Sequence, residues 1–209
     1  MEKRKTIFIV SGSFRTGTSM MMKMLGEAGI GLFYTPIQDT KPEFNPDGYF
    51  EIDIKLFGDY SPSWMKDLDK RAIKVFPWLL HELPDDYDYK IIFMQRNILD
   101  SMRSTAKMMG TVYDTVNEAV NIVGYKKRMQ DAKLLIASKP NMQVQFLQYE
   151  DVLQDPHMFC SLVQKFLNMD MDIEKMAAVP DERKKHFSAN CEEKNRQDSE
   201  DVQIYPIIA

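Results

Sequence analysis

Cysteine is scarce in this sequence, and its spacing is uninformative. Among 209 residues there are 2 cysteines, Cys160 and Cys191, and they form no C-x-x-C pair and no other metal-binding spacing. We therefore expect no structural zinc site. A reduced compartment fits this sparing use of thiols.

Long apolar runs and an excess of positive charge are also missing. No stretch reaches the roughly 18 apolar residues that suggest a transmembrane helix, so we expect no membrane span. The net charge of −4 argues against nonspecific nucleic-acid binding, so any anion site must come from local basic residues. The start, MEKRKTIFIV, imitates a secretion signal, but its apolar part is too short. We therefore expect a cytoplasmic protein.

What the chain does contain is typical of one globular domain. Hydrophobic residues make up 44% and charged residues 28%. The length predicts a single domain over residues 1–209. Beyond Pro180 the sequence turns polar and charged. Residues 188–209 are expected to be a C-terminal extension, either mobile or docked back through its apolar end, VQIYPIIA.

Apolar periodicity predicts strands that alternate with helices. Predicted strands are Thr6–Ser11, Ala72–Phe76, Lys90–Gln95 and Met142–Leu147. Helices are predicted over Tyr49–Tyr60, Ile98–Met109 and Val112–Ala137, and two more are predicted to begin near Thr18 and at Asp155-Pro156. The apolar stripe of the long helix, 112–137, consists of Val112, Val116, Ala119, Val120 and Val123. This order predicts an α/β three-layer sandwich with a mostly parallel central sheet. Ligands bind such sheets at the carboxyl ends of the strands.

One loop suggests which ligand. The stretch Gly12–Ser19, GSFRTGTS, has the spacing of a phosphate-binding loop, G-x-x-x-x-G-K-[ST], but Thr18 replaces the lysine. A nucleoside triphosphate needs that lysine for its β- and γ-phosphates. Backbone N–H groups and the positive end of the following helix would still hold a single phosphate. The alternative is an ordinary strand-to-helix turn that uses glycine for its backbone angles.

A second segment offers another anion contact. Arg96 follows a predicted strand, and Ser104 lies eight residues later in RNILDSMRS, two helical turns along. Arginine can meet a phosphate through two parallel hydrogen bonds, so the two residues could grip one phosphate. The alternative is an arginine paired with Asp100 beside a surface serine.

Together these segments resemble the sulfotransferases that use 3′-phosphoadenosine 5′-phosphosulfate (PAPS). SGSFRTGTS (11–19) is similar to the family's 5′-phosphosulfate loop, and Arg96 and Ser104 match its 3′-phosphate pair, with Ile98 in place of a proline. Further matches are FLQYEDVLQDP (146–156), IKVFP (73–77) and NPDGYFE (45–51), in the family's order along the chain. The resemblance implies a P-loop NTPase-like sulfotransferase fold.

The implied reaction is metal-free, in-line transfer of a sulfuryl group from PAPS to a hydroxyl or amine, which releases adenosine 3′,5′-bisphosphate. The cofactor-binding residues implied are Ser13, Phe14, Arg15, Thr16, Gly17, Thr18, Ser19, Arg96 and Ser104. Arg15 and Lys74 would stabilise charge on the leaving phosphate. Many relatives carry a histidine base two residues after the lysine, but Phe76 occupies that position. We therefore expect Glu51 to be the base, with Asp53 as the second choice. The alternative for Glu51 is that it merely lies in the first turn of a helix, where the helix dipole favours a carboxylate.

Two other functions remain open at this point. One is a P-loop nucleotide or small-molecule kinase, against which Thr18 argues, and the other is a non-catalytic nucleotide-binding protein on the same scaffold. The partner is expected to be a small-molecule acceptor that is apolar or aromatic, and the oligomeric state is undetermined. The acceptor pocket would draw on Phe33, Tyr34, Phe50, Met108, Met109 and Tyr113. A separate basic cluster, Arg183–His186, is either solvated or closes over the 3′-phosphate.

Overall fold

A four-stranded parallel sheet forms the centre of the protein. The computed structural model describes residues 4–35, 48–53 and 63–180. The strands are β1 (Thr6–Ser11), β2 (Ala72–Lys74), β3 (Asp88–Gln95) and β4 (Met142–Gln148), arranged in the order β2-β1-β3-β4. Every neighbouring pair is parallel, so all four carboxyl ends lie at one edge of the sheet. The predicted positions of all four strands are confirmed.

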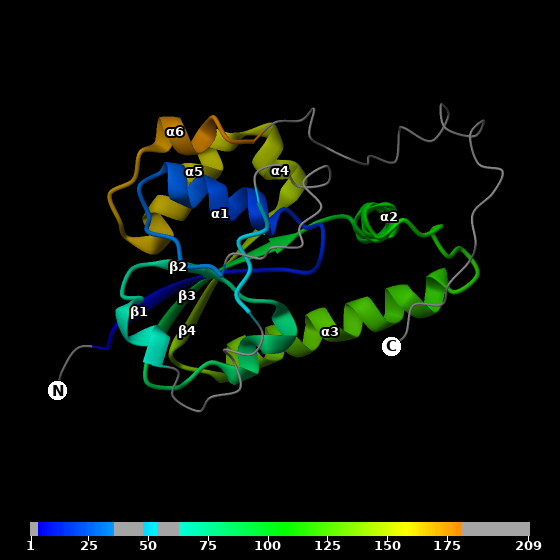
Figure 1. Ribbon diagram of the computed structural model, residues 1–209, viewed down its shortest axis with the longest axis horizontal. Helices are drawn as coiled ribbons and strands as arrows, with labels where there is room; N and C mark the ends of the chain where they lie inside the picture. The colour runs from blue at the N-terminus through cyan, green and yellow to red at the C-terminus, as the bar shows by residue number, and fades with distance from the viewer. Residues whose placement is uncertain (1–3, 36–47, 54–62, 181–209) are drawn as a thin grey trace.

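Helices cover both faces of the sheet, which confirms the predicted α/β three-layer sandwich (Figure 1). One face is covered by α1 (Thr18–Glu27), α4 (Tyr149–Gln154), α5 (Pro156–Leu167) and α6 (Ile173–Ala177). The other is covered by α3 (Glu118–Ser138) and two short 3-10 helices, Ser63–Asp67 and Pro77–Glu82. The remaining helix, α2 (Ile98–Met109), lies beyond the carboxyl ends of the strands (Figure 1).

The alternation of side chains along each strand divides the core in two. In β1, Phe8 and Val10 join the cluster under α1 and α5, whereas Ile7 and Ile9 join the cluster under α3. A strand buried on both faces has to be apolar at successive positions, which is why TIFIVS reads as a continuous apolar run. The inner face of α1 and its C-cap buries Met21, Met24, Leu25 and Ala28, at the i, i+3, i+4, i+7 spacing of a helix.

Helix boundaries follow their capping residues. The Asn97 side chain accepts hydrogen bonds from the N–H groups of Leu99 and Asp100, and α2 begins directly after it, as predicted. The Asp155 side chain accepts from Met158 N at 3.0 Å, which confirms the predicted start of α5. The starts of α2 and α5 are therefore each fixed by the capping residue that precedes the helix in the sequence.

The predicted start and stripe of the long helix are wrong. The segment before Glu118 is not helical, because the Asp114 carboxylate accepts from the N–H groups of Val116 and Asn117, each at 3.0 Å, and holds a turn. Val120 and Val123 are 70% and 67% exposed, because the first half of α3 extends past the sheet (Figure 1). The buried residues come from its second half and are Met129, Ala132 and Ile136.

The predicted helix over Tyr49–Tyr60 is also wrong where the structure describes it. Residues 49–53 form no helix, and Phe50 has a left-handed φ of 52°. Their backbone is held from outside instead: Thr35 N donates to Glu51 O at 2.8 Å, and the Thr35 hydroxyl accepts from Asp53 N at 3.2 Å. The rest of this prediction, the basic cluster 183–186 and the extension 188–209 lie outside the described residues.

None of the helices within the described ranges is long and apolar enough to cross a membrane.

Two glycines with the same backbone twist provide a test of the turn before α1. Gly17 (φ 89°) and Gly29 (φ 90°) are both left-handed, so alanine strains the backbone at either site. A Cβ on Gly17 would lie 2.5 Å from the Tyr149 ring, whereas one on Gly29 meets nothing within 4 Å. We expect Gly17→Ala to lower the free energy of unfolding by about 1–3 kcal/mol more than Gly29→Ala does, measured by urea denaturation. Equal losses would contradict this packing.

Candidate functional site

The loop between β1 and α1 lies at the carboxyl edge of the sheet and presents its backbone there. Gly12 and Gly17 both have positive φ, and a Cβ on Gly12 would approach Met94 O to 2.6 Å. The Thr16 hydroxyl donates to Ser13 O at 2.7 Å and closes the loop internally. The first N–H groups of α1 have no acceptor within the helix, and they start directly after this loop. The geometry is that of an anion-binding turn.

The neighbouring strand and helix hold this loop from outside. Arg96, which follows β3, donates from Nη1 to Arg15 O at 3.0 Å, and the Ser101 hydroxyl on α2 donates to Phe14 O at 2.8 Å. The Arg15 side chain reaches the same helix, where its Nε donates to the Ser104 hydroxyl at 2.9 Å. Ser104 is therefore buried beside the loop and is not a surface serine. Arg15, Arg96 and Ser104, which we call the arginine clamp, are brought together by these contacts.

Positive charge is concentrated in the arginine clamp. The Arg96 guanidinium lies over the Tyr149 ring at 4.7 Å, and its side chain is 4% exposed with Glu150 Oε1 at 3.9 Å. Burial lowers the pKa of Arg15, and the nearby charge of Arg96 lowers it further, while Tyr49 acts in the opposite direction. Two guanidinium groups taken out of water beside each other favour a bound anion, which would relieve their repulsion.

A buried lysine lies on the other side of the loop. Lys74, at the end of β2, donates from Nζ to Tyr49 O at 2.9 Å, to the Ser19 hydroxyl at 3.3 Å and to Glu51 Oε1 at 3.2 Å. Its side chain is 4% exposed and that of Glu51 is 29% exposed. Burial lowers the pKa of Lys74, and Glu51 opposes that effect. Lys74 thus brings an ammonium group to the start of α1, although the loop itself has Thr18 where a lysine is usual.

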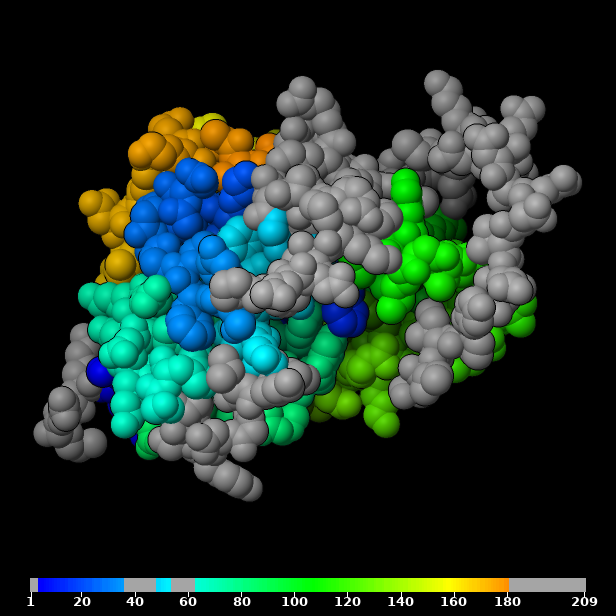
Figure 2. Space-filling model, viewed as in Figure 1, coloured from blue at the N-terminus to red at the C-terminus, as the bar shows by residue number. Residues whose placement is uncertain are grey.

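Three aromatic rings adjoin this lysine. Phe76 and Trp78 stack with 4.7 Å between ring centroids and 4° between planes, and Phe14 of the loop packs against both at 4.9 and 5.4 Å. Lys74 Nζ lies 5.4 Å from the centre of the Phe76 ring. Phe14 is 43% exposed and Trp78 is 37% exposed. In Figure 2 the loop after β1 reaches the surface as a dark-blue patch beside the cyan segment 48–53. The three rings form an aromatic wall beside Lys74.

The loop residues named from sequence divide into three kinds. Ser13, Thr16 and Thr18 are buried and shape the loop. Phe14 points its ring into the aromatic wall, and its backbone carbonyl accepts the hydrogen bond from Ser101 that holds the loop to α2. Arg15 and Ser19 make side-chain contacts to residues from other elements. Of the predicted acceptor residues, Tyr34 and Phe50 meet edge to face at 5.3 Å, and Met109 is 55% exposed.

Three residues at the site were not predicted from sequence. Ser101 holds Phe14 O, the Tyr125 side chain of α3 is hydrogen-bonded to that of Ser13, and Tyr149 supports Arg96 and blocks Gly17. Burial raises the pKa of Tyr125 and Tyr149. A signal existed for Tyr149, since it lies in FLQYEDVLQDP, one of the segments that resemble the sulfotransferases, but we assigned it no role. Ser101 lies inside RNILDSMRS at a position to which we also gave no role, and Tyr125 belongs to no motif, so only the fold reveals their contacts.

Acidic, histidine and cysteine side chains do not gather into a metal site within the described part of the chain. The two described histidines pair with carboxylates at the surface: His81 with Glu82 at 2.9 Å and His157 with Glu174 at 3.2 Å.

Comparison with solved structures identifies the fold. A sulfotransferase from Mycobacterium tuberculosis H37Rv superposes with a TM-score of 0.56 over 85% of this chain and 71% of that one, at 16% sequence identity. The sulfotransferase domain of the olefin synthase from Synechococcus PCC 7002 gives a TM-score of 0.55 over 84% and 78%, at 15% identity. No family model and no curated protein matches the sequence. The chain therefore has a sulfotransferase-like fold of the P-loop type, which confirms the predicted fold.

The lowered pKa of Lys74 makes stability depend on pH. The folded protein releases this proton below the ordinary pKa of 10.5, so between the lowered value and 10.5 the unfolded chain binds more protons. The free energy of unfolding of the wild type should then rise relative to Lys74→Met by up to about 1.4 kcal/mol per pH unit in that window. Urea denaturation between about pH 8 and 10.5 measures the difference. The exposed Lys165→Met is the control, and a pH-independent difference would contradict the burial of Lys74.

Proposed function

We propose that this protein is a sulfotransferase that moves a sulfuryl group from PAPS to a small acceptor molecule. The observation that carries the proposal is the arginine clamp, in which the Arg15 side chain contacts buried Ser104 and Arg96 contacts the Arg15 backbone, next to an anion-binding loop. PAPS has phosphate at both ends of its ribose. A ligand of that kind matches a loop that takes one phosphate and a pair of guanidinium groups that takes the other.

The donor set of the site fits PAPS. The proposed binding residues are those of the loop, Ser13 to Ser19, for the 5′-phosphosulfate, together with Arg96 and Ser104 for the 3′-phosphate. Arg15 lies between the two sets, because its backbone belongs to the loop and its Nε donates to Ser104. The guanidinium groups and the Lys74 ammonium supply the charge that the leaving phosphate requires, and in a water-poor site such preorganised donors are worth a few kcal/mol each.

Sulfuryl transfer also requires that the acceptor lose a proton. The acceptor oxygen or nitrogen forms a bond to sulfur while the bond from sulfur to the phosphate oxygen breaks, and the acceptor proton passes to a base. We assign that base to Glu51, whose carboxylate is held by Lys74 at 3.2 Å yet is 29% exposed, so that an incoming acceptor can reach it. Phe76, in the position where many relatives have histidine, supplies an aromatic surface and no base.

The surroundings of Glu51 and Lys74 favour an aromatic acceptor. The aromatic wall of Phe14, Phe76 and Trp78 presents partly exposed rings beside the lysine. Aromatic pairs gain stability from offset or edge contacts in addition to apolar burial. An acceptor whose hydroxyl or amine is attached to a ring could rest on this wall and direct its reacting atom toward Glu51.

The alternative function, a kinase, would require the loop to bind a nucleoside triphosphate. A nucleoside triphosphate would need a cation that follows its β- and γ-phosphates, and Thr18 is buried with its methyl group turned toward Gly12. Lys74 comes from β2 and not from the loop position at which the lysine of a nucleoside triphosphate site stands. We therefore expect tight binding of adenosine 3′,5′-bisphosphate, and tight ATP binding with phosphoryl transfer would overturn the proposal.

Arg96→Ala tests the 3′-phosphate assignment. Loss of a charge-assisted contact should weaken binding of adenosine 3′,5′-bisphosphate by about 10- to 150-fold, corresponding to roughly 1.5–3 kcal/mol. Affinity for adenosine 5′-phosphate, which lacks the 3′-phosphate, should change much less. Isothermal titration calorimetry with both nucleotides measures the two effects.

The control for this experiment is Arg103→Ala. Arg103 lies on α2 with its guanidinium over the Tyr113 ring at 5.6 Å, outside the arginine clamp. Arg103→Ala should leave both affinities within about twofold of wild type. If Arg96→Ala weakens both nucleotides equally, Arg96 does not read the 3′-phosphate.

Glu51→Gln tests the assigned base. The amide keeps the shape of the side chain but cannot accept the proton, so transfer of labelled sulfuryl group to a phenol should fall by about 10²–10⁴-fold. Binding of adenosine 3′,5′-bisphosphate should remain close to wild type. Asp53→Asn removes the second candidate base and should leave turnover close to wild type, whereas a loss confined to Asp53→Asn would assign the base to Asp53. Unchanged turnover in Glu51→Gln would remove Glu51 as the base, and transfer to no acceptor from the wild type would favour a binding protein.

A further inference from the structure

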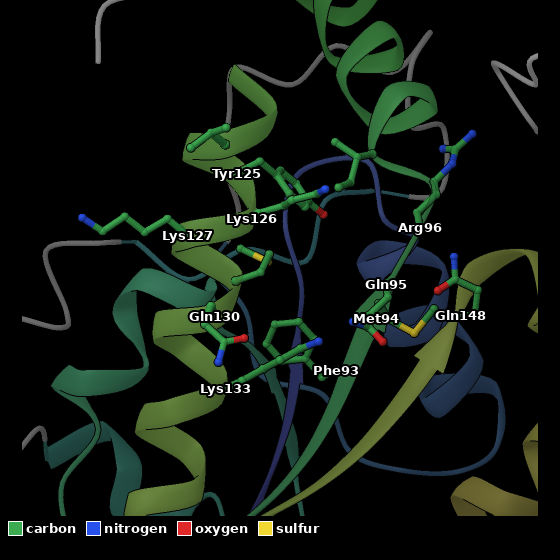
Figure 3. A pocket seen from close by; sticks show the side chains of 13 residues that line it. Phe93, Met94, Gln95, Arg96, Tyr125, Lys126, Lys127, Gln130, Lys133 and Gln148 are labelled. Carbon is green, nitrogen blue, oxygen red and sulfur yellow. The ribbon is translucent and has the colours of Figure 1, made fainter. Parts of the chain in front are cut away.

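We propose a second anion site, which takes an organic anion with an aromatic or other apolar body. It is the cavity between α3 and the carboxyl ends of β3 and β4, with a volume of about 640 Å³ (Figure 3). That size suits a small organic molecule. The site goes beyond the proposed sulfuryl transfer, since neither Lys74 nor Glu51 lines it.

The charge of the cavity lining is one-sided. Lys126, Lys127 and Lys133 of α3 line one side and Arg96 borders the other, and among the described lining residues there is no carboxylate. Figure 3 shows Lys126 and Lys133 reaching into the cavity, whereas Lys127 points away from it. Neither Lys126 nor Lys133 forms an ion pair within the described part of the chain. In a chain with net charge −4, such a cavity concentrates positive potential where an anion can enter.

The floor of the cavity is apolar and aromatic. Phe93 of β3 lines the cavity. Its ring packs at 5.4 Å between centroids against Phe146 of β4, which lies next to the lining, and Lys133 Nζ is 5.1 Å from the centre of the Phe146 ring. Met129 of α3 is buried beneath the same lining. Amide groups of Gln95, Gln130 and Gln148 add hydrogen-bonding capacity around this floor. A lysine-lined cavity with an aromatic ring in its lining matches a ligand that has both a negative group and an apolar body.

The cavity adjoins the phosphate loop without being part of it. Tyr125 lines the cavity, and its side chain is hydrogen-bonded to that of Ser13 in the loop. Arg96 borders the cavity but directs Nη1 to Arg15 O and its guanidinium over the Tyr149 ring, toward the loop and α4. Lys126 and Lys133 are thus the cations that serve this cavity and not the loop. We therefore expect an anion in the cavity to bind at the same time as a nucleotide in the loop.

The test compares two probes that differ in charge and little in shape, 1-naphthalenesulfonate and 1-naphthalenesulfonamide. Each is titrated into the full ¹⁵N-labelled chain and followed by amide chemical shifts. We expect saturable shifts at Lys126, Gln130 and Lys133 with the sulfonate, and an affinity at least about fivefold weaker for the neutral sulfonamide. Higher salt should weaken only the sulfonate. Equal affinities, or shifts confined to the loop 12–19, would overturn the proposal.

Variants and a competing nucleotide complete the test. Lys126→Gln combined with Lys133→Gln should reduce sulfonate affinity to that of the sulfonamide, while Lys165→Gln, on the exposed face of α5, should leave it within about twofold. Saturating adenosine 3′,5′-bisphosphate should not displace the sulfonate, and displacement would show that the cavity belongs to the nucleotide site. If the bisphosphate fails to bind while the sulfonate titration holds, the proposed sulfuryl transfer fails and the second anion site is supported.

Discussion

The arrangement of this protein depends on keeping two cations out of water at one edge of a parallel sheet. Lys74 ends β2 and Arg96 follows β3, the two strands that flank β1, and their side chains are each 4% exposed. Burial of an unpaired charge is costly, so each requires nearby partners. Glu51 and Tyr49 O serve Lys74, while Tyr149 and Arg15 O serve Arg96. The loop between β1 and α1 lies between them and is held from both sides.

This arrangement explains why the loop does not need the lysine of a nucleoside triphosphate site. Its cations come from neighbouring strands and from Arg15 inside the loop, so positive charge surrounds the phosphate position instead of extending along a triphosphate chain. The same distribution leaves Thr18 free to be buried against Gly12. Two solved structures with the same fold are sulfotransferases, and the distribution of charge is the basis for proposing a ligand with two separated anionic groups.

The two faces of the carboxyl edge differ in chemistry. Beside Lys74 the surface is aromatic, formed by Phe14, Phe76 and Trp78. Beside α3 the surface combines lysines with the Phe93 and Phe146 rings. The first surface lies beside the 3-10 helix Pro77–Glu82 and the second beside α3, and both elements cover the face of the sheet opposite α1 (Figure 1). A parallel sheet with loops at one edge can present such different surfaces within one fold.

The sequence by itself determined the local features of this protein. Apolar patterns located the strands, Asp155-Pro156 located the start of α5, and the spacing of Gly12 and Gly17 located the loop between β1 and α1, because each depends on residues close together in the chain. Only the tertiary structure decided which residues from distant segments are in contact. The valines predicted to form the buried stripe of α3 are exposed, since a helix buries a face only where something covers it. The tertiary structure also placed Ser101, Tyr125 and Tyr149 at the site. Contacts between distant segments follow from strand order and helix placement, which no local pattern encodes.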